Sequence, residues 1–372
     1  MRAYLDWNAT APPHPTVLAA MSDASREAWG NPSSVHAEGR AARRWVERAR
    51  EAVAALAGKD VRDVVFTSGG TEANNIAITS AMERKGKLLL ARLEHPSVTR
   101  VAERYERERR VRWLRVLPSG AIDLDDLRAA LAEGDVSTLA IAAVSAEMGI
   151  LQPLDTAIGL AQAHGVWVHV DAVQAFGRVQ SATLLARRAD SASLAAHKLR
   201  GPKGIGALAT MQNAKIVPVL VGGAQERGLR PGTVDAVACA GLLAAVSRAE
   251  ESAAAYATKG TLRDRLESAL LELGAERNGD PAVRAPHVAS LAFPGFLGPE
   301  LVAALDLEGV AVSAGPACSA GTMEPSKSLT MLYGEDRARH TIRISLGEDT
   351  TDEVVDFALS IFREVLQRSP RT

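Results

Sequence analysis

Short apolar segments alternate with helical ones from about residue 62 of this chain onward. Parallel sheets are built in this way, because a crossover, usually helical, must connect each strand to the next parallel one. The alternation therefore predicts an α/β fold with a mostly parallel, doubly wound sheet. The expected strands are 64–67, 87–91, 111–116, 138–144, 166–170 and 205–210, and the expected helices between them include 71–82, 123–132 and 156–163.

A long helical pattern over residues 234–273 separates this region from a second one. The chain has 372 residues, which is more than one hydrophobic core usually serves. We therefore expect a large domain over residues 14–255, a smaller α+β domain over 256–372, and an N-terminal segment, 1–13, near the active site. In the smaller domain the pattern predicts strands at 288–293, 310–313 and 341–346, and helices at 299–307, 326–333 and 351–366.

Charge and cysteine content exclude several classes of protein. The net charge is −1 with no long basic run, which argues against nucleic acid or an anionic membrane as the main partner. The two cysteines, Cys239 and Cys318, form neither a disulfide framework nor a zinc site. No signal peptide and no apolar run of about 20 residues is visible. We therefore expect a protein of the reducing cytoplasm.

The segment FTSGGTEANN, residues 66–75, joins an expected strand to an expected helix through two glycines. A helix N-terminus offers free N–H groups and a positive dipole end, which suit a phosphate, and the Thr71 hydroxyl can add a further bond. The alternative is that Thr71 only caps the helix. The spacing matches neither a dinucleotide fingerprint nor a Walker A loop.

Two further motifs place ionisable side chains where an α/β sheet binds ligands. Asp171 ends the strand pattern VHVD and could pair with a pyridinium nitrogen, or it could merely cap the next turn. Lys198 follows the apolar stretch 192–196. A lysine in an apolar site has a lowered pKa and can form a Schiff base, although most lysines near glycine turns are solvated.

Cys318 and Arg343 complete the set of candidate residues. Cys318 lies among small residues in SAGPACSAG, where a nucleophilic thiolate would be exposed. Cys239, in ACAGLLAAV, has the surroundings of a structural cysteine. Arg343 alternates with isoleucines in TIRISL and could hold a carboxylate through two hydrogen bonds, or could be a surface cation.

Taken together, these motifs resemble the NifS/IscS-like cysteine desulfurases, which belong to the class V aminotransferase family of fold-type I pyridoxal-phosphate (PLP) enzymes. The resemblance runs nearly end to end. Its motifs are YLDWNATAP, GNPSSVH, FTSGGTEANN, Glu94-His95-Pro96, GILQPL, HVDAVQAFG, HKLRGPKGIGAL, GGAQERGLRPGT, the Cys318 loop with Glu324-Pro325-Ser326, and IRISLG.

The resemblance implies a large domain with a mostly parallel sheet of the seven-stranded type and a smaller C-terminal domain. It implies a homodimer that converts L-cysteine to L-alanine. The sulfur would pass to Cys318 as a persulfide and then to a protein acceptor, such as an iron–sulfur scaffold or a tRNA-thiolation protein. No metal is implied, apart from a transient iron–sulfur cluster at Cys318.

Each matching position takes a role from the resemblance. Lys198 forms the Schiff base and is the expected base, His95 stacks on the ring and moves a proton, and Cys318 attacks the sulfur. Arg343 and Asn8 are expected to bind the substrate. The expected PLP contacts are Gly70, Thr71, Glu72, His95, Asp171, Gln174, His197 and Lys198, with Thr233 reaching in from the second subunit.

Two positions depart from the family pattern. Ala146 stands where the family has an asparagine that helps hold the phenolic oxygen of PLP, and Ala195 stands where it has a phosphate-binding serine. Each loss removes a hydrogen bond worth about 0.5–3 kcal/mol. The alternatives are another PLP enzyme of this fold (a selenocysteine lyase, a C–S lyase or an aminotransferase) and a weakly active homologue that serves mainly as a binding protein.

Overall fold

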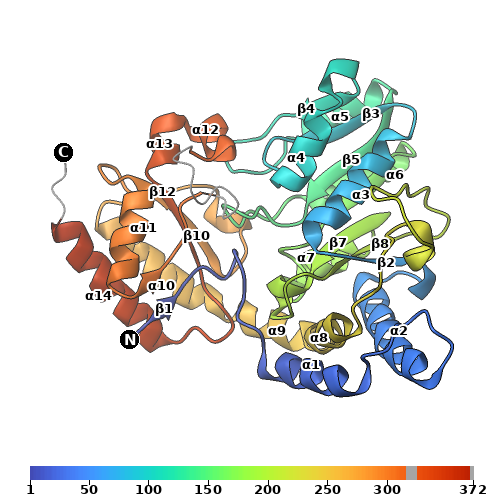
Figure 1. Ribbon diagram of the computed structural model, residues 1–372. Coiled ribbons are helices and arrows are strands. Elements are labelled where there is room, and N and C mark those ends of the chain that lie inside the picture. Colours follow the sequence, from blue (N-terminus) through green and yellow to red (C-terminus); the bar gives the residue numbers. More distant parts are fainter. Residues whose placement is uncertain (316–324, 369–372) are drawn as a thin grey trace.

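The computed structural model describes residues 1–315 and 325–368, so Cys318 lies outside the described residues. A seven-stranded sheet forms the centre of the larger part of the chain (Figure 1). All its neighbouring strands are parallel except β8, which runs antiparallel to β2 and β7, so the predicted α/β fold with a mostly parallel sheet is confirmed. The strand order is β2 (Val64–Thr67), β8 (Gly206–Thr210), β7 (Ser191–Ala195), β6 (Trp167–Asp171), β5 (Val136–Ala142), β3 (Lys87–Ala91) and β4 (Val111–Leu114).

Strand β7 is absent from the strands expected from the sequence. Its residues, Ser-Ala-Ser-Leu-Ala, are small, and all five are buried between its neighbours β6 and β8. A central strand covered on both faces shows no alternation of apolar and polar residues. The sequence signal for this strand is therefore weak, although the strand leads directly to Lys198.

Helices cover the central sheet, and those between its strands are α3 (Gly70–Met82), α4 (Pro96–Glu103), α5 (Leu124–Ala132), α6 (Leu154–Ala163) and α7 (Gln180–Ala186). Two helices that our sequence analysis does not predict, α1 (Pro15–Glu27) and α2 (Ala37–Ala57), precede the sheet and pack against α8 (Ala236–Ser247). The long helix expected over 234–273 is three consecutive helices, α8, α9 (Ala249–Ala257) and α10 (Lys259–Glu272).

The C-terminal part contains an antiparallel sheet of β12 (Thr341–Ser345), β10 (Val288–Ala292) and β9 (Glu276–Arg277). Its helices are α11 (Gly298–Leu307), α12 (Lys327–Tyr333), α13 (Glu335–Arg339) and α14 (Asp352–Arg368). The N-terminal strand β1 (Ala3–Tyr4) pairs in parallel with β11 (Val310–Ala311), so the two ends of the chain share this part of the molecule.

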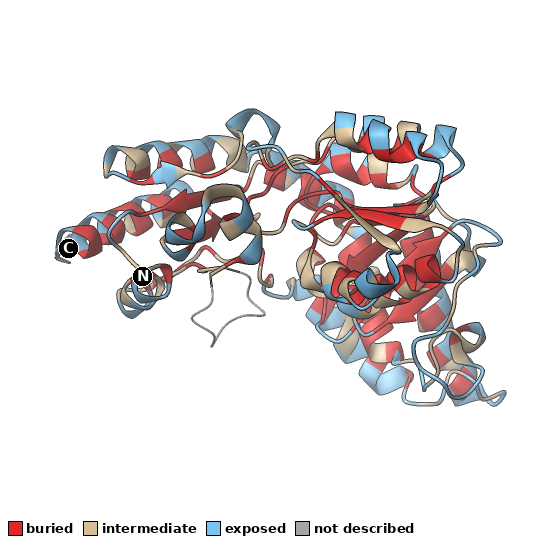
Figure 2. Cartoon of the chain, turned by 90° about the horizontal axis from the view of Figure 1, so that it is seen from above, coloured by how far each residue is buried: buried red, intermediate tan, exposed pale blue. Residues whose placement is uncertain are grey.

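Buried side chains fall into two main clusters (Figure 2). One surrounds the central sheet, and the other joins β10, β12 and α14 to Ala3 and Leu5. The boundary at residue 255 itself stays a prediction. Among the helices of the described residues, none combines the length and the apolar character needed to cross a membrane.

Candidate active site

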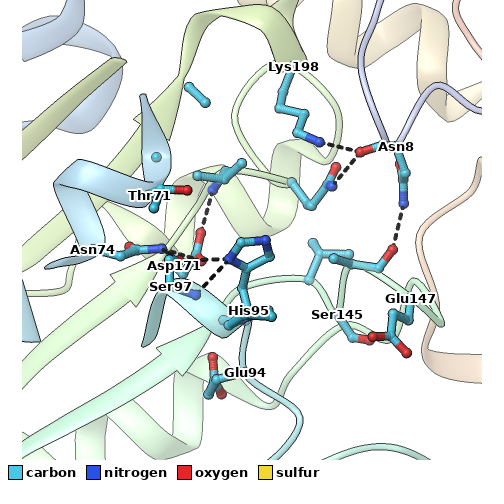
Figure 3. A pocket seen from close by; sticks show the side chains of 18 of the residues that line it. Asn8, Thr71, Asn74, Glu94, His95, Ser97, Ser145, Glu147, Asp171 and Lys198 are labelled. Atoms are coloured by element: carbon cyan, nitrogen blue, oxygen red, sulfur yellow. Dashed lines mark hydrogen bonds between the residues drawn. The ribbon is translucent and has the colours of Figure 1, made fainter. Parts of the chain in front are cut away.

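A cavity of about 280 Å³ opens where strands β5 and β6 of the central sheet end and where β7 runs into the turn that carries Lys198 (Figure 3). Ligand sites of α/β sheets lie at this carboxyl edge. The N-terminal segment and β12 close the cavity from the other part of the molecule. Of the residues expected from the sequence, the cavity wall brings together Asn8, Gly70, Thr71, His95, Asp171, Gln174, His197, Lys198 and Arg343, as well as Ala146 and Ala195.

Lys198 lies in a short 3-10 turn, Ala196–Leu199, directly after β7. Its Nζ donates to the carbonyl oxygens of Asn8 and Ala9, the latter at 2.8 Å. The pKa of this amine is lowered to about 7. Withdrawal from water is the main cause, and the charges of Arg178 and Arg343 contribute to the same shift. Half of the amines are therefore neutral near pH 7, and only the neutral form can attack an aldehyde.

This pKa predicts how uptake of PLP by the cofactor-free protein depends on pH. Because the pKa is lowered, the amine is neutral above about pH 7 and protonated below it. We expect the second-order rate constant for PLP capture to rise with pH through a midpoint near 7 and then level off. Stopped-flow absorbance at several pH values measures this constant. A rise that continues to pH 10, as for an ordinary lysine, would contradict the prediction.

Asp171 is held by a chain of buried polar groups on β6, β7 and α3. Its Oδ2 accepts from Asn74 Nδ2 at 2.7 Å, and its Oδ1 accepts from the Val173 N–H at 3.1 Å. Asn74 Oδ1 lies 3.1 Å from Nε2 of His169. Burial lowers the pKa of His169 to about 4, so this imidazole is neutral and donates through Nε2. This series of hydrogen bonds fixes the carboxylate of Asp171, which can accept a hydrogen bond from a protonated ring nitrogen.

His95 is the N-cap of α4 and faces the cavity (Figure 3). Its Nδ1 accepts from the Ser97 N–H at 3.1 Å, so in the neutral ring Nε2 carries the proton. Burial lowers the pKa of His95, which favours this neutral form. The ring can therefore stack on a ligand and donate or receive a proton at Nε2.

Gln174 and Asn8 belong to a network around Arg178, a residue that our sequence analysis does not single out. Arg178 Nη1 donates to Gln174 Oε1 and to Asn8 Oδ1, both at 2.8 Å. Gln174 Nε2 donates to the carbonyl oxygen of Asn8 at 3.1 Å. Asn8 Nδ2 in turn donates to the carbonyl oxygen of Ala146 at 3.2 Å. The only sequence signal for Arg178 is its spacing of four residues from Gln174.

The opposite wall of the cavity contains the N-terminus of α3, with Gly70 and Thr71. A Cβ atom at position 70 would lie 2.6 Å from Val173 Cγ2, so a glycine is required there. His197 Nδ1 lies 3.1 Å from Thr10 Oγ1. Ser193, the serine nearest to Ala195, bonds to Asp171 Oδ1 at 3.4 Å and does not line the cavity. Ser193 therefore does not replace the family's phosphate-binding serine.

Arg343 reaches the cavity from β12 and is 5% exposed. Its Nη2 donates to Asp6 Oδ1 at 2.7 Å and its Nη1 to the carbonyl oxygen of Ala146 at 3.0 Å. Its Nε has no hydrogen-bond partner among the described residues. The guanidinium is thus held in place by two acceptors, and its Nε is buried.

Two carboxyl groups in the cavity wall, the buried Glu94 and the half-buried Glu147, are not among the residues expected from the sequence. Burial raises the pKa of both, that of Glu94 strongly. Glu147 accepts from the Ser326 hydroxyl, which caps α12. Glu94 directly precedes His95, so only its place beside a selected residue could have drawn attention to it.

Glu72 and Thr233 do not line the cavity. Glu72 accepts from the Ser68 N–H and lies 3.2 Å from Arg230 Nε, while Thr233 is exposed on the surface of this chain. Their expected contacts with PLP stay predictions. Within residues 1–315 and 325–368, no group of three or more His, Cys, Asp or Glu side chains is placed to hold a metal ion.

The donor set of the cavity fits PLP. An amine of lowered pKa, a fixed carboxylate, an amide and an imidazole converge on one space, and a helix N-terminus with a hydroxyl lies beside them. These groups match an aldehyde, a ring nitrogen, a phenolic oxygen, an aromatic face and a phosphate. Ala146 and Ala195 contribute no side-chain donor to this set.

Comparison with known proteins agrees with this geometry. Residues 3–357 match the aminotransferase class-V family. The chain is 39% identical to a cysteine desulfurase from Rhodobacter capsulatus, over 98% of this chain and 96% of that protein. It is 38% identical to the cysteine desulfurase IscS of Methylococcus capsulatus, over 98% of this chain and 92% of that protein.

Solved structures give the same picture. The chain superposes on a NifS-like protein with a TM-score of 0.91 and 32% identity, covering 99% of this chain and all of the other. It also superposes on SspA in complex with cysteine, with a TM-score of 0.81 and 30% identity, over 94% of this chain and all of the other.

Proposed function

Because the chain belongs to the aminotransferase class-V family and is a cysteine desulfurase within it, we propose that Lys198 binds PLP and that the cavity receives L-cysteine. The observation that carries this proposal is the partly buried Lys198 amine, whose pKa is lowered to about 7, in a cavity shared with Asp171, His95 and Gln174. The products would be L-alanine and a persulfide on the chain.

Each residue of the site has a task in this proposal. PLP, when bound through Lys198, supplies an electron sink for the bonds of the substrate's Cα and Cβ atoms. Asp171 would keep the ring nitrogen protonated, and Gln174 would donate to the phenolic oxygen. The Lys198 amine, once free, can take the Cα proton, while His95 Nε2 can exchange a proton with the ligand.

Substrate binding is assigned to the N-terminal segment and β12. The guanidinium of Arg343, which Asp6 and the Ala146 carbonyl hold in place, would bind the substrate carboxylate. The backbone of Asn8 would stay close to the same ligand. Cys318, which lies outside the described residues, is the proposed acceptor of the sulfur.

Mass spectrometry after incubation with L-cysteine and PLP tests cofactor, substrate and sulfur acceptor together. We expect PLP fixed on Lys198 after borohydride reduction, an added sulfur on Cys318, and one alanine for each sulfur transferred. PLP on Lys198 without sulfur on Cys318 would indicate a different PLP enzyme. Protein free of both modifications would contradict the proposal.

A second copy of the chain and a protein acceptor of sulfur are the proposed partners. Large apolar side chains on the surface of the single chain support a homodimer, notably Val221, Val35 and Trp29, which are 98%, 82% and 74% exposed. Thr233 would then contribute to the cavity of the other subunit. The proposed compartment is the cytoplasm, where an iron–sulfur scaffold or a tRNA-thiolation protein would receive the sulfur.

The two alanines in the cavity wall predict weakened PLP binding. Ala146→Asn and Ala195→Ser together restore two donors with a combined contribution of about 2–4 kcal/mol, so we expect the dissociation constant to fall by about thirtyfold or more. Titration of PLP into cofactor-free protein of both forms measures the change. Ser193→Ala serves as a control, because it shows how much the existing serine of β7, which bonds to Asp171, contributes to PLP binding. Equal constants for the parent and the restored protein would show that other groups already compensate.

A further inference from the structure

Arg178 is a fully buried cation that has no carboxylate among its hydrogen-bond partners in residues 1–315 and 325–368. Its Nε donates to the Lys198 carbonyl oxygen at 3.0 Å, and its Nη2 donates to that of Trp7 at 2.8 Å. Its Nη1 bonds to side-chain oxygens of Asn8 and Gln174. Burying a guanidinium without a carboxylate partner is costly, even with the four hydrogen bonds that Arg178 makes. Packing alone would be better served by an uncharged side chain.

The first consequence of this arrangement concerns the amide of Gln174. A guanidinium only donates, so the group bonded to Arg178 Nη1 must be the amide oxygen. Gln174 Nε2 is thereby left as the donor of this cavity-lining side chain, and it donates to the carbonyl oxygen of Asn8. This is the orientation that an acceptor on a ligand, such as a phenolic oxygen, requires.

The second consequence concerns the charge around Lys198. Arg178 and the Lys198 amine both bond to Asn8, Arg178 Nη1 to its side-chain oxygen and Lys198 Nζ to its carbonyl oxygen. The positive charge of Arg178 therefore lies close to the amine and opposes its protonation, which contributes to the lowered pKa of Lys198. The other charged and titratable groups that face this amine are Asp6, His95, Asp171, His197 and Arg343. Of these, Asp6 and Asp171 favour protonation, so Arg178 offsets part of their effect.

We propose that Arg178 is a positioning residue of the active site, which orients Gln174 as a donor and keeps the Lys198 amine neutral and reactive. The proposal rests on the function proposed for Lys198. It goes further by assigning the preparation of both groups to one residue that need not touch substrate or cofactor. A merely structural Arg178 would affect the stability of the fold and leave the reactivity of the Lys198 amine unchanged.

The charge is tested on the cofactor-free protein by acetylation of Lys198 with acetic anhydride over a range of pH, followed by peptide mass spectrometry. The exposed Lys215 is the internal reference. We expect the midpoint near pH 7 to rise by about one pH unit in Arg178→Met and to stay close to the parent value in Arg178→Lys. An unchanged midpoint in Arg178→Met would overturn this role.

The orientation of Gln174 is tested by a double-mutant cycle with Arg178→Lys and Gln174→Leu. Each single variant should raise the PLP dissociation constant, and the double variant should bind no more weakly than the weaker single one, because both changes remove the same donor. Losses that add fully would overturn the orienting role. Thermal unfolding shows whether Arg178→Met folds. If it does not, the double-mutant cycle still tests the proposal, because it uses Arg178→Lys instead.

The two proposals fail in different ways. The acetylation profile needs no PLP, so it reports on Arg178 even if the protein binds no cofactor. If borohydride fixes no PLP on Lys198 of the parent protein, the proposed function is wrong. If PLP is fixed there but neither the midpoint nor the cycle responds to Arg178, only the inference about Arg178 is wrong.

Discussion

Lys198→Ala is expected to remove alanine production and the borohydride-reducible PLP band, with turnover lower by at least about a thousandfold. The reason is that the amine both bonds to the aldehyde and takes a proton, and that no other lysine among the described residues lines the cavity. The fold should persist, because the side chain contributes only two hydrogen bonds, to the carbonyl oxygens of Asn8 and Ala9. Steady-state alanine release and absorbance spectra of the purified variant measure the loss.

Lys203→Ala is the matched control for this experiment. Lys203 lies five residues further along the same motif but is exposed, and it does not line the cavity. Its replacement should leave both the band and the turnover at parent values. Alanine production by Lys198→Ala at the parent rate would overturn the assignment of Lys198.

Cys318→Ser is expected to abolish transfer of sulfur to the protein while PLP binding and the spectral response to L-cysteine persist. A serine hydroxyl with its ordinary pKa is a poor nucleophile towards sulfur, whereas a thiolate attacks it readily. Radiolabelled cysteine followed by non-reducing electrophoresis measures the bound sulfur. We expect at least a hundredfold loss, about the contribution of a well-placed catalytic group.

Cys239→Ala is the control that shows whether the loss of bound sulfur in Cys318→Ser is specific to Cys318 or follows from the loss of any cysteine. Cys239 is buried in α8, and burial raises the pKa of its thiol, so it is unreactive at neutral pH. The Cys239 variant should carry as much labelled sulfur as the parent. Release of sulfide by Cys318→Ser at the parent rate, without added thiol, would remove Cys318 from the mechanism.

Much of the fold is predictable because its strands carry local signals. The apolar runs over 64–67 and 87–91 become β2 and β3 with the expected bounds. Strand β7 is the exception, since its small, fully buried residues show no alternation. Helix α2 has a clear amphipathic pattern and ends at Gly58, both of which are signals of a helix. It is missing from the prediction because the alternation of strands and helices begins only at about residue 62.

The site is predictable only to the extent that its residues end strands or begin helices. Asp171 and Thr71 meet this condition, and the sheet topology brings them to one edge. Asn74, Arg178 and Glu147 act through partners up to 179 residues away, such as Ser326 for Glu147. Nothing in the sequence around such a residue reveals that pairing, because it arises only when distant segments pack.

The N-terminal segment has a consequence for how the protein is made. Asn8 N donates to Ser345 Oγ, and Asp6 bonds to Arg343, in each case across 337 residues of sequence. During synthesis the segment around Asp6 and Asn8 can therefore take its place against Lys198 only after β12, 337 residues further along the chain, has been made. The cavity is completed only once β12 has been made, so a chain that stalls before β12 lacks a working site, even with the whole central sheet folded.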